Sequence, residues 1–175
     1  AELAADLAAN PMSEWKVILA DLRKQKFGKV IPLHVAKKGY QIHQNKALFD
    51  AMIASAIAVL GKDSFQIATL GTLGAFSQFF ISIALKGIHA SFNVGNADKW
   101  PCFYKLNSNH NGLIASKRSI GMTRQVCWNT VQAAIASAEA QATLKHTANS
   151  LELITPQAFT KDLAQWIEAK EAFQL

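Results

Sequence analysis

The chain has 175 residues, half of them hydrophobic, which is enough for one substantial core and predicts a single domain over residues 1–175. Its two richest apolar runs, 51–60 and 67–85, are short or interrupted by polar residues, so neither supplies the roughly 18 apolar residues of a membrane-spanning helix. The formal net charge is +6, which points to polyphosphate binding if the cations gather on one face.

The first third of the chain predicts a hairpin. The run 15–19 fits both a strand and a helix, and we favour the strand. Residues 27–29 supply a turn, and residues 30–35 predict a second strand in which Pro32 indicates a sheet edge or a bulge.

A helix and two further strands are expected next. Asn45 is expected to cap a helix over 46–60 that ends at Gly61. Residues 64–73 and 75–85 are rich in Phe, Ile and Thr, so they predict an antiparallel pair of strands. The apolar side of the helix is expected to comprise Leu48, Met52, Ile53 and Ile57.

The second half predicts another hairpin and a long helix. Residues 100–106 and 113–120 are its expected strands, with Asn111-Gly112 as the turn, because Asn-Gly is the strongest short hairpin signal. Thr123 is expected to cap a helix that runs through Leu144 and packs on the sheet with its small residues.

Together these elements predict an α+β fold. Its antiparallel β-sheet, built from hairpins, packs against the long central helix in a β-β-β-α-like core over about 14–150. A last helix over 156–173, opened by Pro156, caps that core or docks on a second copy of the chain.

Positive charge is concentrated in two windows. Residues 22–49 contain seven cations and no acid, and residues 99–138 contain five cations and no acid. If the windows fold together they form one basic face, which is typical of nucleic-acid binding. The alternative is two solvated surfaces that happen to lack acids.

The sequence argues against catalysis. Cys127 with His110, His146 and Asn129 resembles a thiol site, but Cys127 is flanked by apolar residues at the expected start of a helix. No CxxC or HxxxH pair supports a metal, and no phosphate-binding loop with the GxxxxGK[ST] pattern occurs, so we expect no catalytic residue, metal or cofactor.

A nucleic-acid contact surface is the favoured alternative. Phe103 and Trp128 are assigned to the core, whereas Tyr104 lies on the alternate face of its strand and is the expected stacking residue. The cations expected to contact phosphates are Lys37, Lys38, Lys105, Lys117, Arg118, Arg124 and Lys145.

Several motifs resemble the phage/plasmid-like family of unknown function. The matching boxes are Tyr40-Gln41-Ile42-His43-Gln44-Asn45, His110-Asn111-Gly112, Val126-Cys127-Trp128-Asn129-Thr130 and Lys145-His146-Thr147. Asn111 replaces the family's usual Asp and Lys145 its usual Arg. The resemblance implies a setting on phages and plasmids and hence DNA handling, and the element order is similar to the core of single-strand annealing recombinases, which assemble into rings or filaments.

The leading hypothesis is therefore a protein that binds single-stranded DNA and promotes annealing or recombination as a homo-oligomer. It is expected to act in the cytoplasm of a bacterial host cell and to have no membrane partner. The alternatives are an inhibitor that docks on a host defence factor, and an enzyme centred on Cys127. A network of satisfied hydrogen bonds is expected to tie the long helix to the sheet. Its members are Asn111, Asn129, Thr130, His146 and Thr147.

Overall fold

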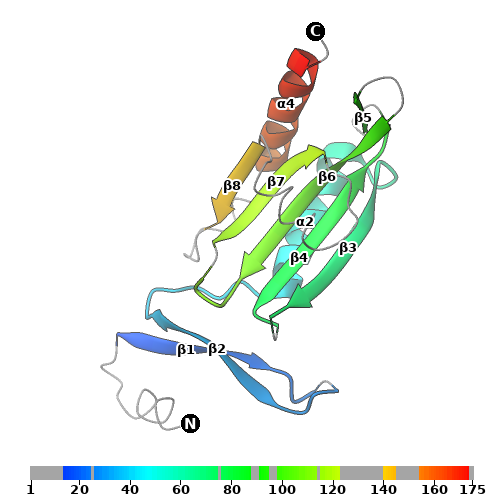
Figure 1. The fold of residues 1–175 in the computed structure, drawn as a ribbon. Helices are drawn as coiled ribbons and strands as arrows, with labels where there is room; N and C mark the ends of the chain where they lie inside the picture. Colours follow the sequence, from blue (N-terminus) through cyan, green and yellow to red (C-terminus); the bar gives the residue numbers. More distant parts are fainter. Residues whose placement is uncertain are drawn as a thin grey trace.

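A computed structural model describes residues 14–24, 26–74, 76–87, 91–94, 98–113, 115–122, 140–144 and 154–173. This part of the chain forms two antiparallel sheets and two helices (Figure 1). The strands are β1 (Trp15–Asp21), β2 (Val30–Lys37), β3 (Phe65–Leu73), β4 (Gln78–Leu85), β5 (Ser91–Val94), β6 (Asp98–Asn109), β7 (Ser116–Met122) and β8 (Ala140–Leu144). The helices are α2 (Asn45–Leu60) and α4 (Pro156–Phe173).

β1 and β2 form the predicted first hairpin as a sheet of their own. Ile18 pairs with His34 and Leu19 with Pro32, so the register shifts by one residue at this point. Proline lacks the N–H group that a regular ladder requires, which explains why the irregularity lies opposite Pro32. The predicted bulge is confirmed.

The larger sheet has six strands in the order β3-β4-β6-β7-β8, with β5 paired to β6 beside this path. The predicted pairing of 64–73 with 75–85 is confirmed as β3 with β4. The predicted second hairpin is confirmed as β6 with β7, and Gly112 in its connection has a φ of 70°, a conformation that suits glycine.

The long central helix predicted over 123–144 is wrong in its last turn. Residues 140–144 form β8, which pairs antiparallel with β7. The open edge of β7 offers backbone N–H and C=O groups, and this ladder overrides the helix propensity of a sequence with two alanines. Residues 123–139 lie outside the described part of the chain.

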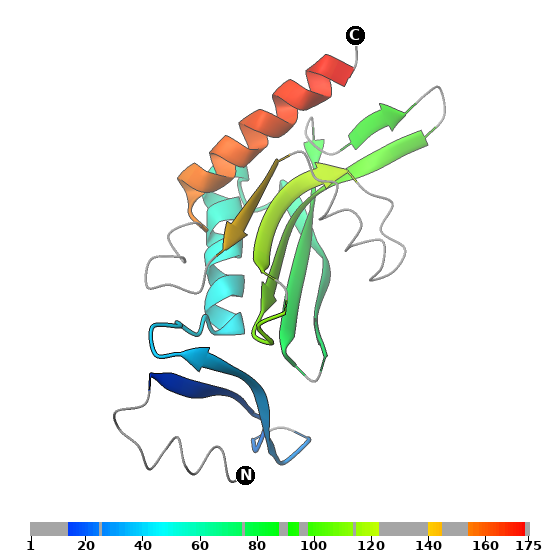
Figure 2. The same cartoon turned by 60° about the vertical axis from the view of Figure 1, so that its left-hand side comes forward.

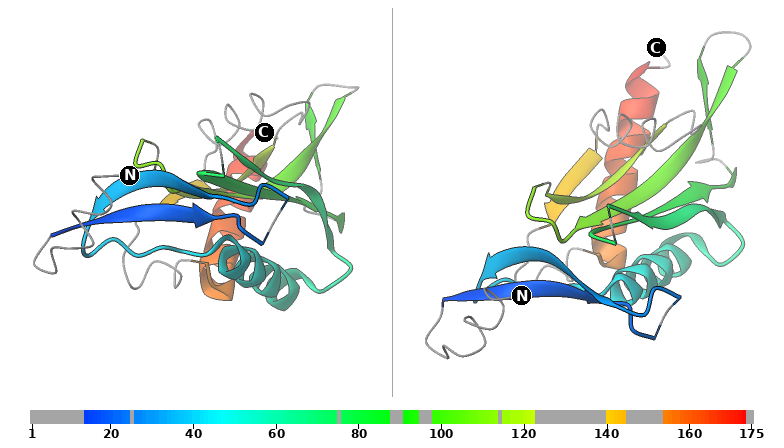
Figure 3. Two further views of the ribbon diagram at one scale, coloured as in Figure 1. Left: turned by 90° about the horizontal axis from the view of Figure 1, so that it is seen from below. Right: turned by 60° about the horizontal axis from the view of Figure 1, so that its bottom comes forward.

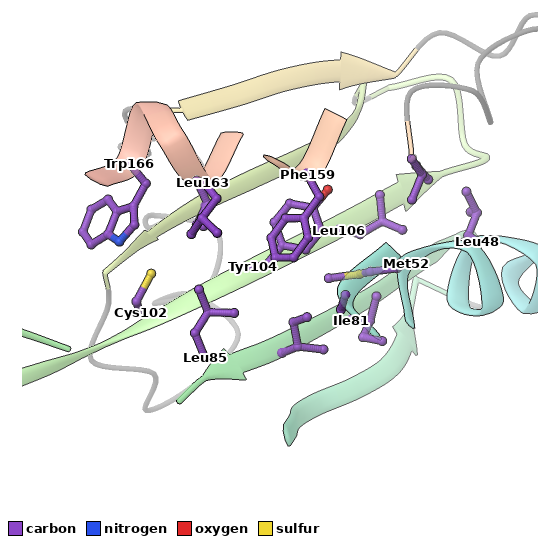
Figure 4. Close-up of a cluster of buried hydrophobic side chains, with 14 of the residues drawn as sticks. Leu48, Met52, Ile81, Leu85, Cys102, Tyr104, Leu106, Phe159, Leu163 and Trp166 are labelled. Carbon is purple, nitrogen blue, oxygen red and sulfur yellow. The ribbon is translucent and has the colours of Figure 1, made fainter. Parts of the chain in front are cut away.

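Both helices pack on the same face of the six-stranded sheet (Figure 2). The side chains of α4 contribute Phe159, Leu163 and Trp166 to the core. The Phe159 ring lies 4.3 Å from the Tyr104 ring of β6, measured between centroids (Figure 4). Burying such aromatic side chains is a large part of what holds a helix to a sheet.

α2 differs from its prediction at its N-terminus and on its apolar side, but not at its C-terminus. Asn45 is the first residue of the helix rather than its cap, and Gln44 precedes it without a side-chain capping hydrogen bond. Leu48 and Met52 are buried as expected, but Ile57 is exposed. The predicted end is confirmed, because the Gly61 N–H donates to the Ile57 carbonyl at 2.9 Å with a φ of 85°.

Candidate functional site

The β1–β2 hairpin is a strongly basic ribbon. Residues 14–38 contain seven cations and two acids, so the segment has a formal charge of +5. Six of the cations are exposed, and Lys16 is partly buried. The exposed cations are Arg23, Lys24, Lys26, Lys29, Lys37 and Lys38. A two-stranded ribbon of this charge is one of the elements with which proteins contact nucleic acid.

One cation of the hairpin is already paired. The Arg23 guanidinium donates to both carboxylate oxygens of Asp21, at 2.9 and 2.7 Å. These hydrogen bonds lower the pKa of Asp21 to about 2. Asp21 is therefore ionised at neutral pH and its charge is matched by Arg23, which leaves the lysines as the uncompensated charge of the ribbon.

Exposed apolar side chains accompany these cations. Trp15 is 49% exposed and Phe27 is 53% exposed, and Leu19, Val30 and Val35 are also exposed. Exposed apolar side chains among cations are suited to contact with a partner. Aromatic faces beside lysines suit the bases and phosphates of a single strand.

The predicted contact residues are divided by the structure. Lys37 and Lys38 are exposed at the end of β2, and Lys117 is partly buried in β7. Lys105 and Arg118 are buried in the sheet, at 1% and 6% exposed. The expected single basic face is therefore not formed by these residues.

Tyr104 is not a surface residue, so its predicted stacking position is wrong. Strand alternation separates it from Phe103, but both side chains are buried because both faces of β6 are covered. On its own face Tyr104 packs against α4. On the opposite face the Lys105 amine lies 5.6 Å from the centre of the Phe103 ring, a cation–π contact.

Arg118 has a structural partner. Its Nε donates to Asp162 Oδ2 at 2.7 Å and its Nη2 donates to Asp162 Oδ1 at 3.2 Å, so the pair is bidentate. Both side chains are buried, and the pair joins β7 to α4. A guanidinium held in this way is a fold contact rather than a phosphate ligand.

Several predicted residues lie outside the described part of the chain. Asn111, which is described, accepts a hydrogen bond from the Leu113 N–H at 3.0 Å through its Oδ1, so it shapes the β6–β7 connection locally. The predicted residues that lie outside the described part are Arg124, Cys127, Asn129, Thr130, Lys145, His146 and Thr147.

The hairpin lies beside the start of α2 (Figure 3). A pocket of about 520 Å³ is lined by residues of the hairpin, the start of α2, β3 and the end of β6. His43 and His110 line it, and each is 5% exposed. The Tyr40 hydroxyl lies 3.4 Å from His110 Nδ1, and the Asn45 side chain adds an amide to the wall. The first two boxes of the sequence therefore converge on one cavity.

The hairpin is docked at two places beside this pocket. The Phe27 ring at the hairpin tip meets Phe76 of the β3–β4 turn edge to face, with 5.1 Å between centroids. The His34 imidazole lies directly against Gly112, where a Cβ atom would overlap the ring. Glycine at this position allows the close approach of β2 to the β6–β7 connection.

Sequence reasoning did not assign site roles to Trp15, Phe27, His43 or Asn45. The charge window signalled the hairpin, but nothing in it distinguished exposed aromatic residues from buried ones. For the pocket, the signal was the presence of His43 and Asn45 in one box and His110 in another. Only the chain fold shows that these boxes meet.

The described residues contain neither a metal-binding cluster nor a membrane-spanning helix. No group of three or more His, Cys, Asp or Glu side chains there is placed to hold a metal ion. None of the helices in that part is long and apolar enough to cross a membrane.

Comparison with known proteins identifies a family but no activity. The chain matches no curated protein and no solved structure. A family model described as a domain of unknown function, DUF932, matches residues 32–174, which include most of β2 and the whole six-stranded sheet but not β1 or pocket residues 18–22. The chain belongs to the DUF932 family.

Proposed function

We propose that the protein binds single-stranded nucleic acid, with DNA as the expected strand, through the β1–β2 hairpin. The observation that carries the proposal is the combination of five exposed lysines with half-exposed Trp15 and Phe27 on one ribbon. The lysines are Lys24, Lys26, Lys29, Lys37 and Lys38.

Each group has a separate role in this mechanism. The lysines neutralise phosphates and release counterions, which supplies affinity without regard to sequence. Trp15 and Phe27 offer ring faces to unpaired bases, and such stacking is available only when the bases are not enclosed in a duplex. The preference for single strands therefore rests on the aromatic side chains and the affinity on the lysines.

We further propose that binding serves strand annealing or recombination by an oligomer, as the similarity to annealing recombinases implies. Support comes from β3, which is an edge strand of the six-stranded sheet among the described residues. β3 contains no charged residue, and Ile67 and Leu70 in it are exposed. An uncharged edge strand with exposed apolar side chains is suited to contact with another copy of the chain.

The test is binding of a fluorescent oligonucleotide at increasing salt. A triple variant, Lys24→Gln, Lys26→Gln and Lys29→Gln, should weaken binding by more than tenfold at low salt. It should also lower the slope of log affinity against log salt by about 0.7 per lost contact. The matched control is Lys62→Gln, Lys86→Gln and Lys161→Gln, three exposed lysines outside the hairpin.

If the two triple variants lost the same oligonucleotide affinity, net charge alone would drive binding. The proposal that the hairpin is the binding site would then be rejected. Trp15→Ala tests the stacking role separately. It should reduce the preference for single over double strands, because the base–aromatic contact is worth about 1–3 kcal/mol per base.

A further inference from the structure

The β1–β2 hairpin has one face against the body of the molecule and one face open. Residues directly opposite each other in an antiparallel ladder share a face. Ile18 and its partner His34 lie on the inner face, where Ile18 is 1% exposed and the His34 ring lies against Gly112. Leu19 and its partner Pro32 lie on the outer face, and both are exposed. The ribbon therefore offers its outer face to a partner.

The middle of this outer face is apolar. The open face of an antiparallel sheet is normally polar, since water covers it. The pairs on the outer face are, from one end to the other, Trp15 with Lys37, Val17 with Val35, Leu19 with Pro32, and Asp21 with Val30. The two middle pairs contain no hydrogen-bonding side chain, although Leu19 is 50% exposed and Val35 is 36% exposed. An apolar face left open in this way is suited to contact with a partner.

Exposed cations lie at both ends of the apolar middle. They are Lys37 and Lys38 at the end of β2, and Lys24, Lys26 and Lys29 at the hairpin tip. Asp21 is the one acid in the ladder, and Arg23 compensates its charge. At roughly 3.3 Å per residue a strand as long as β1 spans about 23 Å, so a polyanion that reaches both groups of lysines must cross the apolar middle.

An apolar contact of this kind distinguishes DNA from RNA by the sugar. Deoxyribose has a methylene group at C2′, whereas ribose carries a 2′-hydroxyl, the group by which a protein can tell RNA from DNA. A hydroxyl pressed against Leu19 and Val35 would lose its water and find no hydrogen-bond partner, which is unfavourable. The C5-methyl group of thymine gains from the same surface, because apolar side chains suit it.

We propose that the hairpin selects DNA over RNA because the middle of its outer face is an apolar contact for deoxyribose and thymine. This inference rests on the proposed function, since it concerns the same bound strand. The lysines at the two ends hold phosphates and set the affinity, whereas Leu19, Val35 and their partners decide which sugar is accepted. Two hairpins, each with a charge of +5, repel each other, so a second copy of the chain is a poor occupant of this face.

The experiment measures binding of three single strands to the whole protein by fluorescence anisotropy at low salt. The strands are homopolymers of thymidine, deoxyuridine and uridine, each of about 12 nucleotides, a length within known single-strand site sizes. Deoxyuridine differs from uridine only by the 2′-hydroxyl and from thymidine only by the methyl group. We expect deoxyuridine to bind about tenfold more tightly than uridine, the effect of a buried hydroxyl without a partner. Thymidine should bind about threefold more tightly again, for one buried methyl group.

A double variant tests whether this face makes the selection. Leu19→Gln with Val35→Thr places hydrogen-bonding groups in the middle of the face, and threonine keeps the β-branched side chain that suits a strand. The preference for deoxyuridine over uridine should fall below about threefold, because the hydroxyl then has partners. The matched control is Leu70→Gln with Ile67→Thr in β3, where the two side chains are 51% and 47% exposed. The control should keep the full preference.

Failure of the selection and failure of the hairpin give different results. The triple lysine variant should weaken binding of all three strands by the same factor, because the lysines contact phosphates that DNA and RNA share. Equal affinity for deoxyuridine and uridine would reject the selection and retain the hairpin. An unchanged preference in the Leu19→Gln, Val35→Thr variant would overturn the proposal, and a changed sedimentation of that variant without DNA would then assign the face to contact between copies. Absence of binding to every strand would reject the hairpin and the selection together.

Discussion

The Arg118–Asp162 pair shows why a cation in a basic window need not be a contact residue. Both side chains are buried, and two hydrogen bonds join them. Asp162→Ala would leave the guanidinium buried without its carboxylate, so we expect a loss of about 3–5 kcal/mol in the free energy of unfolding. Urea denaturation provides the measurement.

Two further variants distinguish the effect of breaking the ion pair from the effect of substituting any acid in α4. Glu168→Ala removes an exposed acid from the same helix and should change stability by no more than about 0.5 kcal/mol. The double variant Arg118→Met, Asp162→Leu removes both charges and should recover most of the loss. A double variant as unstable as Asp162→Ala would contradict this account.

Lys105 predicts a pH dependence of stability. Burial lowers the pKa of Lys105 to about 8, from 10.5. The unfolded chain therefore binds the proton more tightly than the folded protein, so stability should rise as the pH increases from about 8 towards 10. At about 1.4 kcal/mol per pKa unit, the total gain is at most roughly 3.5 kcal/mol.

The measurement is urea denaturation at several pH values up to about 9.5. Higher pH reverses the sign, because burial raises the pKa of Tyr40 to about 12 and the folded protein then retains a proton that the unfolded chain loses. Lys105→Met should be more stable at pH 7 and lose the rise above pH 8, while the exposed Lys62→Met should keep it. If the free energy of unfolding of Lys105→Met still increased above pH 8, the increase would arise from another titrating group.

Elements with strong local signals could be predicted from the sequence. The Asn-Gly pair, the apolar spacing of α4 and the Phe- and Ile-rich run of β4 each specify local structure without knowledge of their neighbours. β8 could not be predicted in this way, because Ala140–Leu144 forms a strand only where the edge of β7 provides backbone partners. Its structure is a tertiary effect.

The features of the candidate site also differ in whether they could be predicted from the sequence. Charge is a property of the sequence, so the basic character of the hairpin was visible before its fold. Exposure depends on what covers each strand, and this is why Lys105 and Tyr104 were assigned to the surface although both are buried. The pocket requires His43 to meet His110, which is 67 residues further along the chain, and no local pattern reports such a contact.

At the scale of the whole molecule, the hairpin is a separate two-stranded sheet that depends on the larger body for its stability. An isolated hairpin of this size is at best marginally stable in water. The views from below show it lying across the lower end of the body, beside α2 and the β6–β7 connection (Figure 3). The nucleic-acid binding that we propose for it would therefore depend on contacts such as that of His34 with Gly112.

Gly112→Ala tests this dependence. The new Cβ atom would overlap the His34 imidazole, and alanine at a φ of 70° adds roughly 1–2 kcal/mol of backbone strain. The hairpin should undock while the six-stranded sheet remains folded. Hydrogen exchange should then show faster exchange for the β1 and β2 amides and unchanged protection for β4 and β6. Gly39→Ala, where a Cβ atom meets nothing, should leave both unchanged. If protection in β4 and β6 falls together with that of the hairpin, the two sheets unfold as one unit and the hairpin is not an independently docked element.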